Sequence, residues 1–308
     1  MTMLKNNIHI PVLANELINN LNINQNGTYV DCTAGFGGHS KLILEKLKSG
    51  KLICIDHDIN AIQHLNKLFK GNKKVLIVHD NFTNLKKIIP NRVDGFVFDL
   101  GVNSLMLDDP NRGFSYKLDG LLDMRMNKLN KLTARYIINN YQPWQLINLF
   151  EKYGETKKTK LVVNKIIHQR KTKPINTTIE LANLICSCFK TFNRSRKHPA
   201  KTFFQALRIV VNDEINCLVN GLKQAINLLK HKGRIAVISF HSIEDRIIKN
   251  TFKEFTTKKD LFNKTVPLTK IVDANFKLIT KKPIVPSESE ILFNSRSHSA
   301  KLRIMERI

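Results

Sequence analysis

Residues 31–40, Asp-Cys-Thr-Ala-Gly-Phe-Gly-Gly-His-Ser, have the composition of a ligand-binding turn. Glycines between a strand and its following helix let the backbone approach a ligand, and the helix N-terminus supplies N–H donors. Two classes of adenosine cofactor use this layout. Ser40 stands where the dinucleotide fingerprint has its third glycine, and Asp31 would repel a pyrophosphate but suit an ammonium group. The loop favours S-adenosylmethionine over NAD, with a purely structural tight turn as the alternative.

Two further residues could complete a site for an adenosine. Asp56 ends the next apolar run, where a carboxylate accepts hydrogen bonds from both ribose hydroxyls in either cofactor class. A helix N-cap explains Asp56 nearly as well. Phe82 follows the third apolar run, directly after Asp80 and Asn81, where it could border the adenine. Together with the loop, these positions favour S-adenosylmethionine as the cofactor.

The elements that must position these residues alternate between strand and helix patterns. Apolar, β-branched runs predict five strands, with helices expected over about 40–48 and 60–69. This alternation predicts an α/β fold with a doubly wound, Rossmann-like sheet. Three later segments are candidate strands that would close the sheet. The predicted strands cover residues 28–31, 51–56, 75–79, 94–100 and 234–240, and the candidates cover 269–272, 276–280 and 300–305.

The stretch between the fourth and fifth strands is far too long for a simple crossover, and its patterns are helical. It predicts an inserted helical domain over 109–199, with the sheet domain formed by 1–108 and 200–308. One helix should precede the fifth strand. Its apolar positions are Leu207, Val211, Ile215, Leu218, Leu222 and Leu229.

The composition describes a basic protein with an ample apolar fraction. Hydrophobic residues make up 42%, and 50 Lys and Arg against 25 Asp and Glu give a formal charge of +25. Such a charge attracts nucleic acid, although a compositional bias toward Lys, Asn and Ile would also produce it. No apolar run is long enough to span a membrane, and the N-terminus lacks the pattern of a secretory signal. We expect a soluble, cytoplasmic protein whose basic stretches include 157–160, 170–173 and 194–198.

The cysteines and histidines do not form a metal motif. The five cysteines show no C-x-x-C spacing, and the ten histidines include no H-E-x-x-H. Small buried thiols are the favoured interpretation of the cysteines. No metal site is predicted.

Many ordered blocks give the chain a family resemblance. It resembles, nearly end to end, the bacterial 16S rRNA cytosine-N4 methyltransferases, which modify a cytidine in the decoding region of the small subunit. The most specific block is Asp-Leu-Gly-Val-Asn-Ser at 99–104, followed by Arg-Gly-Phe-Ser at 112–115. Other matching blocks are 9–13, 31–40, 56–58, 122–126, 153–155, 198–200, 204–209, 237–246, 282–284 and 299–303.

The resemblance implies a class I S-adenosylmethionine-dependent methyltransferase with an inserted substrate-recognition domain. Its implied partner is 16S rRNA within the assembled 30S subunit, and the enzyme would be a monomer or homodimer without a membrane or metal requirement. A seventh cofactor contact, usually Gln, falls on Met106, and Asn103 stands where the family usually has Ser. The implied cofactor contacts are Gly37, Gly38, His39, Asp56, Phe82, Asp99 and Met106.

The chemistry of the reaction suggests roles for other residues. The cytosine amine is a poor nucleophile, so catalysis needs an acceptor for its N–H bonds and a group that takes the released proton. Asp99 is the first candidate, with cofactor binding alone as an equal alternative. Asp123 and His241 are weaker candidates, for which a structural hydrogen bond is the stronger interpretation.

Three polar residues at helical spacing are candidate substrate contacts. Gln205, Arg208 and Asn212 share one flank of the helix expected before the fifth strand. They would face the cleft and touch RNA, or else form a cluster of hydrogen bonds between domains. The rival functions are a nicotinamide-dependent oxidoreductase, which Ser40 and Asp31 disfavour, and a non-catalytic RNA-binding factor, toward which only Met106 points.

Overall fold

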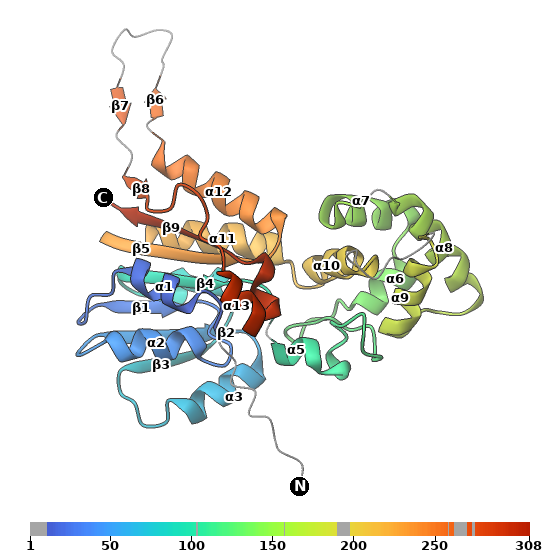
Figure 1. Ribbon diagram of the computed structural model, residues 1–308, viewed down its shortest axis with the longest axis horizontal. Helices are drawn as coiled ribbons and strands as arrows, with labels where there is room; N and C mark the ends of the chain where they lie inside the picture. The colour runs from blue at the N-terminus through green and yellow to red at the C-terminus, as the bar shows by residue number, and fades with distance from the viewer. Residues whose placement is uncertain are drawn as a thin grey trace. The chain divides into compact units, whose positions relative to one another are not determined.

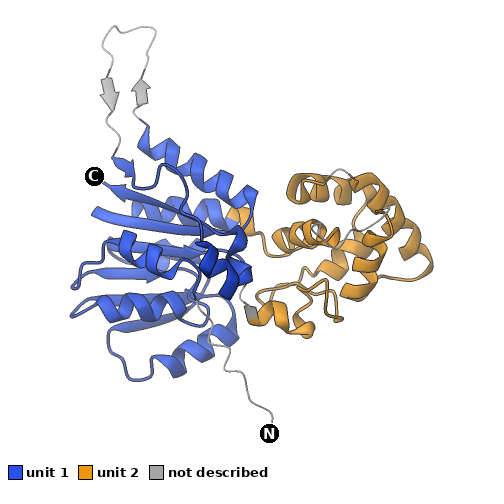
Figure 2. Cartoon of the chain, in the orientation of Figure 1, with its two compact units in different colours: residues 1–101, 217–308 blue, residues 102–216 orange. Residues whose placement is uncertain are grey.

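A computed structural model describes residues 11–102, 104–156, 158–189, 198–257, 259–261, 270–272 and 275–308. The chain divides into two compact units, shown in different colours in Figure 2. Unit 1 comprises residues 1–101 and 217–308, and unit 2 comprises residues 102–216. The second unit is therefore an insertion in the first.

Unit 1 is built on a seven-stranded sheet with the order β3-β2-β1-β4-β5-β9-β8 (Figure 1). The first five strands are parallel, whereas β9 runs antiparallel to both of its neighbours. The α/β doubly wound fold and the sheet-closing role of the late strands at 276–280 and 300–305 are confirmed. The strands are β1 (Thr28–Asp31), β2 (Lys51–Asp56), β3 (Val75–His79), β4 (Val93–Asp99), β5 (Leu229–Ser239), β8 (Phe276–Leu278) and β9 (Lys301–Arg307).

A short antiparallel pair, β6 (Lys259–Leu261) with β7 (Lys270–Val272), forms a separate two-stranded ribbon. The candidate strand at 269–272 therefore pairs outside the main sheet, and its first residue, Thr269, lies outside the described residues.

Alternating side chains of the central strands feed two apolar cores, one on each face of the sheet. Val30 and Phe96 lie in the core that includes residues of α11 and α12, whereas Tyr29 and Val97 lie in the core that includes residues of α1, α2 and α3. The helical elements of unit 1 are α1 (Ala14–Leu21), α2 (Gly38–Lys46), α3 (Ile59–Leu68), η1 (Phe82–Asn84), α4 (Leu85–Ile88), α11 (Glu214–Asn227, which begins in unit 2), α12 (Ser242–Thr256), α13 (Glu288–Phe293) and η3 (Ser295–Ser299).

Unit 2 is helical and has a core of its own. The observed limits, 102 and 216, differ from the expected 109 and 199, because Phe203, Ala206 and Leu207 pack into this core. Its helical elements are α5 (Ser104–Asp108), η2 (Pro110–Arg112), α6 (Ala134–Asn140), α7 (Pro143–Gly154), α8 (Thr159–Thr172), α9 (Thr178–Cys186) and α10 (Ala200–Val211).

The expectation of a single helix before the fifth strand is wrong. The structure has two helices, α10 and α11, separated by Asp213 with φ 50°. Asn212 helps to end α10, because its side chain bonds to the backbone of Met124 and Met126. Leu229, expected on the helix, begins β5. Apolar spacing continued across this break, so periodicity alone could not locate it.

The cysteines and helix lengths agree with the composition. The five cysteines all lie within the described residues and are free thiols, of which Cys32, Cys54 and Cys188 are buried. In the described part of the chain, no helix is both long and apolar enough to cross a membrane.

Candidate functional site

Three carboxylates lie at one edge of the sheet of unit 1. Asp31, Asp56 and Asp99 are the last residues of β1, β2 and β4, which are adjacent parallel strands. Because parallel strands end at a common edge, the topology brings these side chains to one end of the sheet, where α/β proteins bind their ligands. The loop that joins β1 to α2 lies at the same edge (Figure 1).

The loop requires a glycine at position 37. Its φ is +82°, and a Cβ added there would lie 2.6 Å from Cδ2 of Leu68 on α3. The loop is also tied to β2, since Gly35 donates its N–H to Oδ2 of Asp56 at 2.8 Å. Gly38 then begins α2. Contacts with β2 and α3 therefore fix the backbone position at the start of α2.

Asp56 organises the turn after β2 without serving as a helix cap. Its Oδ1 accepts the N–H of Asp58 at 2.8 Å, and it is Asp58 that caps α3 by accepting from Asn60. Each carboxylate oxygen of Asp56 accepts one backbone hydrogen bond and has a second lone pair. This geometry leaves acceptor capacity for a pair of ribose hydroxyls.

Asp31 is enclosed rather than open to a ligand, with 1% of its surface exposed. Its Oδ2 accepts from the Ser40 hydroxyl at 2.7 Å, and its Oδ1 from the Thr33 N–H at 3.3 Å. Burial raises the pKa of Asp31 to about 6, although the Ser40 bond and the nearby His39 oppose the shift. Ser40, which distinguishes this loop from a dinucleotide fingerprint, thus has a direct function as the partner of this carboxylate.

His39, buried at the start of α2, pairs with Asp99, which is partly exposed at the end of β4. The imidazole is 5% exposed, and its Nε2 lies 3.6 Å from Oδ2 of Asp99. Burial would lower the pKa of His39, but Asp99, together with Asp31 and Glu290, raises it above its ordinary value. Asp99 is itself fixed, because its backbone N–H donates to Oγ1 of Thr33 at 2.6 Å.

The pair leaves polar atoms unsatisfied. Within the described residues, both ring nitrogens of His39 and Oδ1 of Asp99 are buried and have no hydrogen-bond partner. Buried polar atoms without partners are rare in folded proteins and commonly mark places where a ligand or water binds. Together with the glycine loop and Asp56, they fit a polar, adenosine-containing cofactor at this edge.

Phe82 lies mostly within the core. It is 8% exposed, and its ring packs edge-on against Phe98 with centroids 5.5 Å apart. A Cβ at Gly221 on α11 would meet its Cδ2 at 2.5 Å, so the absence of a side chain at Gly221 makes room for the ring. An edge of Phe82 bordering an adenine stays a prediction.

His241 has an evident structural role. It is the N-cap of α12, where its Nδ1 accepts the Glu244 N–H at 3.3 Å and Glu244 returns a bond to the His241 backbone. This reciprocal capping box stabilises the start of the helix. Proton transfer by His241 stays a prediction, and the contacts favour the structural alternative.

The remaining expected residues lie in unit 2. Met106, on α5, is 6% exposed and packs in the core of that unit. Asp123 is bound by Arg125 through both carboxylate oxygens, at 2.8 Å each, and this contact lowers the pKa of Asp123 despite its partial burial. The roles of Met106 in cofactor binding and of Asp123 in proton transfer stay predictions.

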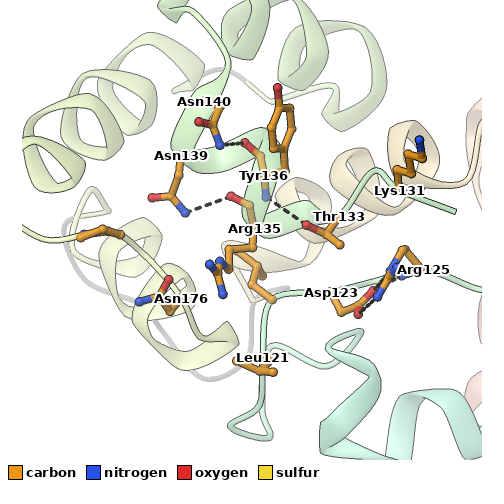
Figure 3. Close-up of a pocket in the computed structure, with 12 residues that line it drawn as sticks. Leu121, Asp123, Arg125, Lys131, Thr133, Arg135, Tyr136, Asn139, Asn140 and Asn176 are labelled. Atoms are coloured by element: carbon orange, nitrogen blue, oxygen red, sulfur yellow. Dashed lines mark hydrogen bonds and ion pairs between the residues drawn. The ribbon is translucent and has the colours of Figure 1, made fainter. Parts of the chain in front are cut away.

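Asp123 lines a hollow of about 650 Å³ in unit 2 (Figure 3). Arg135 extends into this hollow, and Tyr136, with 54% of its surface exposed, lies on its wall. Amide side chains complete the lining, among them Asn140 and Asn176. The hollow therefore combines positive charge, an aromatic face and amide groups.

The three polar residues expected to contact substrate bond within unit 2. Arg208 forms a bidentate pair with Glu214 at 2.8 and 2.9 Å, and both side chains are largely buried. Asn212 donates to the carbonyls of Met124 and Arg208, and Gln205 donates to that of Tyr153 at 3.4 Å. These contacts form a hydrogen-bond cluster within unit 2, not the expected cluster between domains, and a substrate contact stays a prediction.

The sequence did not single out two residues that the structure places at the sheet edge. Thr33 holds the Asp99 backbone, and Glu290 on α13 holds the Leu13 N–H at 2.8 Å while acting electrostatically on His39. Thr33 lies inside the loop and could have been named. Glu290 had no local signal, because it is far along the chain from the residues it approaches.

The strand order, with antiparallel β9 between β5 and β8, and the acidic residues that end β1, β2 and β4 define a class I methyltransferase fold. The chain belongs to the MraW methylase family, whose model matches residues 6–308. It is 49% identical over 303 residues to the ribosomal RNA small subunit methyltransferase H of Ureaplasma urealyticum, covering 96% of this chain and 97% of that protein. A protein of the same name from Fusobacterium nucleatum is 45% identical over 315 residues, covering 100% and 99%.

Proposed function

We propose that the protein transfers a methyl group from S-adenosylmethionine to the N4 amine of a cytidine in the decoding region of 16S rRNA, within the assembled small subunit. The observation that carries this proposal is the sheet edge of unit 1, where the glycine loop, Asp56 and the partly unsatisfied His39–Asp99 pair lie together. Family membership supports the reaction class, and relatives named as small-subunit rRNA methyltransferases support the substrate.

Each part of the cofactor has a suitable partner in this arrangement. Asp56 would hold the ribose hydroxyls and Phe82 would border the adenine. The N–H groups of Gly38 and His39 would donate to a carboxylate at the start of α2, and Gly37, whose own N–H donates to the Ala34 carbonyl, would let the cofactor approach the backbone. When bound, S-adenosylmethionine supplies an electrophilic methyl group on a sulfonium. Met106 would provide an apolar contact where relatives of the implied family usually have a Gln.

Asp99 would act on the target amine or on the methyl donor. The cytosine amine donates its lone pair into the ring, so an acceptor for its N–H bonds is needed to let the nitrogen pyramidalise. The Oδ1 atom of Asp99 is buried and has no partner among the described residues, which suits that task. Thr33 fixes the Asp99 backbone and His39 lies beside the carboxylate, so Asp99 would need little reorganisation during the reaction.

Unit 2 would hold the surrounding RNA. The charge of +25 favours contact with phosphates, and the hollow lined by Arg135 and Tyr136 offers a cation and an exposed ring to a nucleotide strand. The basic stretch at 170–173 belongs to the same unit, whereas residues 157 and 194–197 of the other two stretches lie outside the described residues. The target base must be unstacked to reach the cofactor.

The decisive experiment is incubation of small subunits that lack the modification with the protein and labelled S-adenosylmethionine, followed by mapping of the modified nucleotide. The proposal expects one labelled cytidine in the decoding region, with the methyl group on N4. Cofactor binding without any methyl transfer would instead support a non-catalytic RNA-binding factor. Equilibrium dialysis that detects NAD but not S-adenosylmethionine would support the oxidoreductase.

The RNA contact has its own test. Binding to the small subunit should weaken steeply with salt, and Arg135→Ala should reduce the slope of log K against log salt by about one. Lys73→Ala, which removes an exposed cation just before β3, at the opposite edge of the sheet from the loop, is the matched control and should leave the slope unchanged. A salt-independent affinity would contradict a phosphate-based contact.

A further inference from the structure

A short helix of unit 1, α13, lies at the edge of the sheet that holds the candidate cofactor site (Figure 1). It is followed by η3 and then by β9, whose first residue, Lys301, is paired with Ser239 at the end of β5. Because β5 is parallel to β4, the end of β5 lies at the same edge as Asp99. The connection that contains α13 therefore borders the carboxyl ends of the strands.

Contacts also link α13 to the start of α2. Oε1 of Glu290 on α13 accepts the N–H of Leu13 at 2.8 Å. Two residues before Leu13, Pro11 lies against Gly38, where an added Cβ would be 3.1 Å from Cβ of Pro11. Gly38 is the first residue of α2, and its N–H is one of the donors expected to face the cofactor. One short segment of chain therefore connects α13 with the cofactor loop.

The end of α13 presents two large apolar side chains to solvent. Phe293 is 86% exposed and Leu292 is 84% exposed, and the helix has no buried residue. Adjacent exposed side chains of this size favour an interaction surface over a contribution to folding. The surface lies on the unit that carries the candidate cofactor site, at the same edge of its sheet.

The chain around this apolar pair is basic. Residues 281–301 include four Lys or Arg residues, two Glu residues and one His. Lys282 precedes the helix, Arg296 follows Phe293 by three residues, and both cations are exposed. The formal charge of +25 on the whole chain opposes association with a second copy. An anionic partner with apolar faces fits this surface, and single-stranded RNA has both properties.

The proposed reaction creates a need for such a contact. The target cytidine must leave its stack to reach the cofactor, which exposes the face of a neighbouring base. An aromatic ring at the same edge as the cofactor can cover that face, because bases of every kind stack on aromatic side chains.

We propose that Phe293 stacks on a nucleotide next to the target cytidine, with Leu292 beside it and the exposed cations of the same connection at the phosphates. Phe293 is then a substrate-binding residue that contacts the RNA and not the reacting atoms. The inference rests on the proposed function, because it requires the RNA at this edge of the sheet.

The first test is steady-state methyl transfer to small subunits that lack the modification. Phe293→Ala should lower kcat/KM for the subunit by about 5-fold to 150-fold, mainly through KM, because it removes the stacking of one base. The affinity for S-adenosylmethionine and the thermal melt should stay unchanged, since the side chain is almost entirely exposed. Phe293→Trp should keep the activity, because a larger ring still stacks.

Ile308→Ala is the matched control. Ile308 is a half-exposed apolar residue of unit 1 that follows β9, and β9 ends at the opposite edge of the sheet because it runs antiparallel to β5. This variant should leave kcat/KM unchanged. A change of less than about twofold in Phe293→Ala would overturn the proposal, as would an equal loss of cofactor affinity. Absence of methyl transfer by the natural chain would instead contradict the proposed function, so the two failures are distinguishable.

A crosslinking experiment identifies the partner of this surface. A photoreactive phenylalanine derivative at position 293 should attach to 16S rRNA beside the target cytidine when its complex with the small subunit is irradiated. Attachment to a ribosomal protein or to a second copy of the chain would overturn the proposal. An rRNA yield no higher than from the same derivative at position 308 would overturn it as well.

Discussion

Replacing Asp31 with asparagine should stabilise the sheet unit at neutral pH. The carboxyl group is 1% exposed, and burial raises its pKa to about 6 from the ordinary 3.8. The folded protein therefore binds more protons than the unfolded chain between these two values. The stability that this group contributes is present below pH 3.8 and is lost as the pH rises through about 6.

The magnitude follows from the two pKa values. A difference of about two pKa units corresponds to about 3 kcal/mol between the protonated and ionised forms. Asparagine stays neutral at every pH; its one oxygen can keep the bond from the Thr33 N–H, while its NH2 group can donate to the Ser40 hydroxyl, which is able to accept. The variant should gain up to about 3 kcal/mol of unfolding free energy relative to the natural chain between pH 4 and pH 8.

The assay is urea unfolding followed by circular dichroism at three pH values across this range. The advantage of Asp31→Asn should be small near pH 4 and largest near pH 8. Ser40→Ala should have the opposite effect at pH 8, a loss of about 1–3 kcal/mol, because it removes the hydroxyl that donates to the ionised carboxylate. Asp119→Asn, at an exposed carboxylate, is the control and should show no pH-dependent difference. A constant difference between Asp31→Asn and the natural chain at all pH values would refute the reasoning.

Three further substitutions test the site and the second unit. Asp56→Ala removes the acceptor of the Gly35 N–H and the expected ribose contact, so cofactor affinity measured by dialysis should fall about 100-fold; an unchanged affinity would remove Asp56 from the site. Gly37→Ala forces a side chain into a backbone with φ +82°, and thermal melts should show a loss of about 1–3 kcal/mol. Arg208→Ala breaks a largely buried pair and should cost about 3–5 kcal/mol in urea unfolding, whereas Lys173→Ala, whose side chain is 70% exposed, should change stability by at most about 1 kcal/mol. Equal effects of these last two would contradict the structural role of Arg208.

The strands and their polar end residues could be predicted from the sequence because the signals are local. Each central strand is a continuous apolar run that ends at a turn, and Asp31, Asp56 and Asp99 stand at or next to the ends of such runs. Parallel pairing then requires these ends to meet at one edge. Sequence patterns therefore predicted correctly that these three carboxylates end strands of one sheet.

The rest depended on contacts between residues far apart in the chain. Helical periodicity could not reveal that Asp213 interrupts it, nor that the apolar face of α10 packs in unit 2. The action of Glu290 on His39 likewise joins the end of the chain to its beginning. For Arg208 the sequence could not separate a substrate contact from a hydrogen-bond cluster between domains, and it did not reveal the ion pair with Glu214.

The insertion of unit 2 also has a consequence for how the chain folds during synthesis. β4 must pair with β5, yet all of residues 102–216 are made between them. Until β5 emerges, β4 presents an unpaired apolar edge, which is prone to non-native association. Unit 2 has its own core and is complete before β5 appears, so we expect it to fold first and to shorten the loop that must close. Slowing the folding of unit 2 should therefore delay the closure of a sheet whose described strands all belong to unit 1.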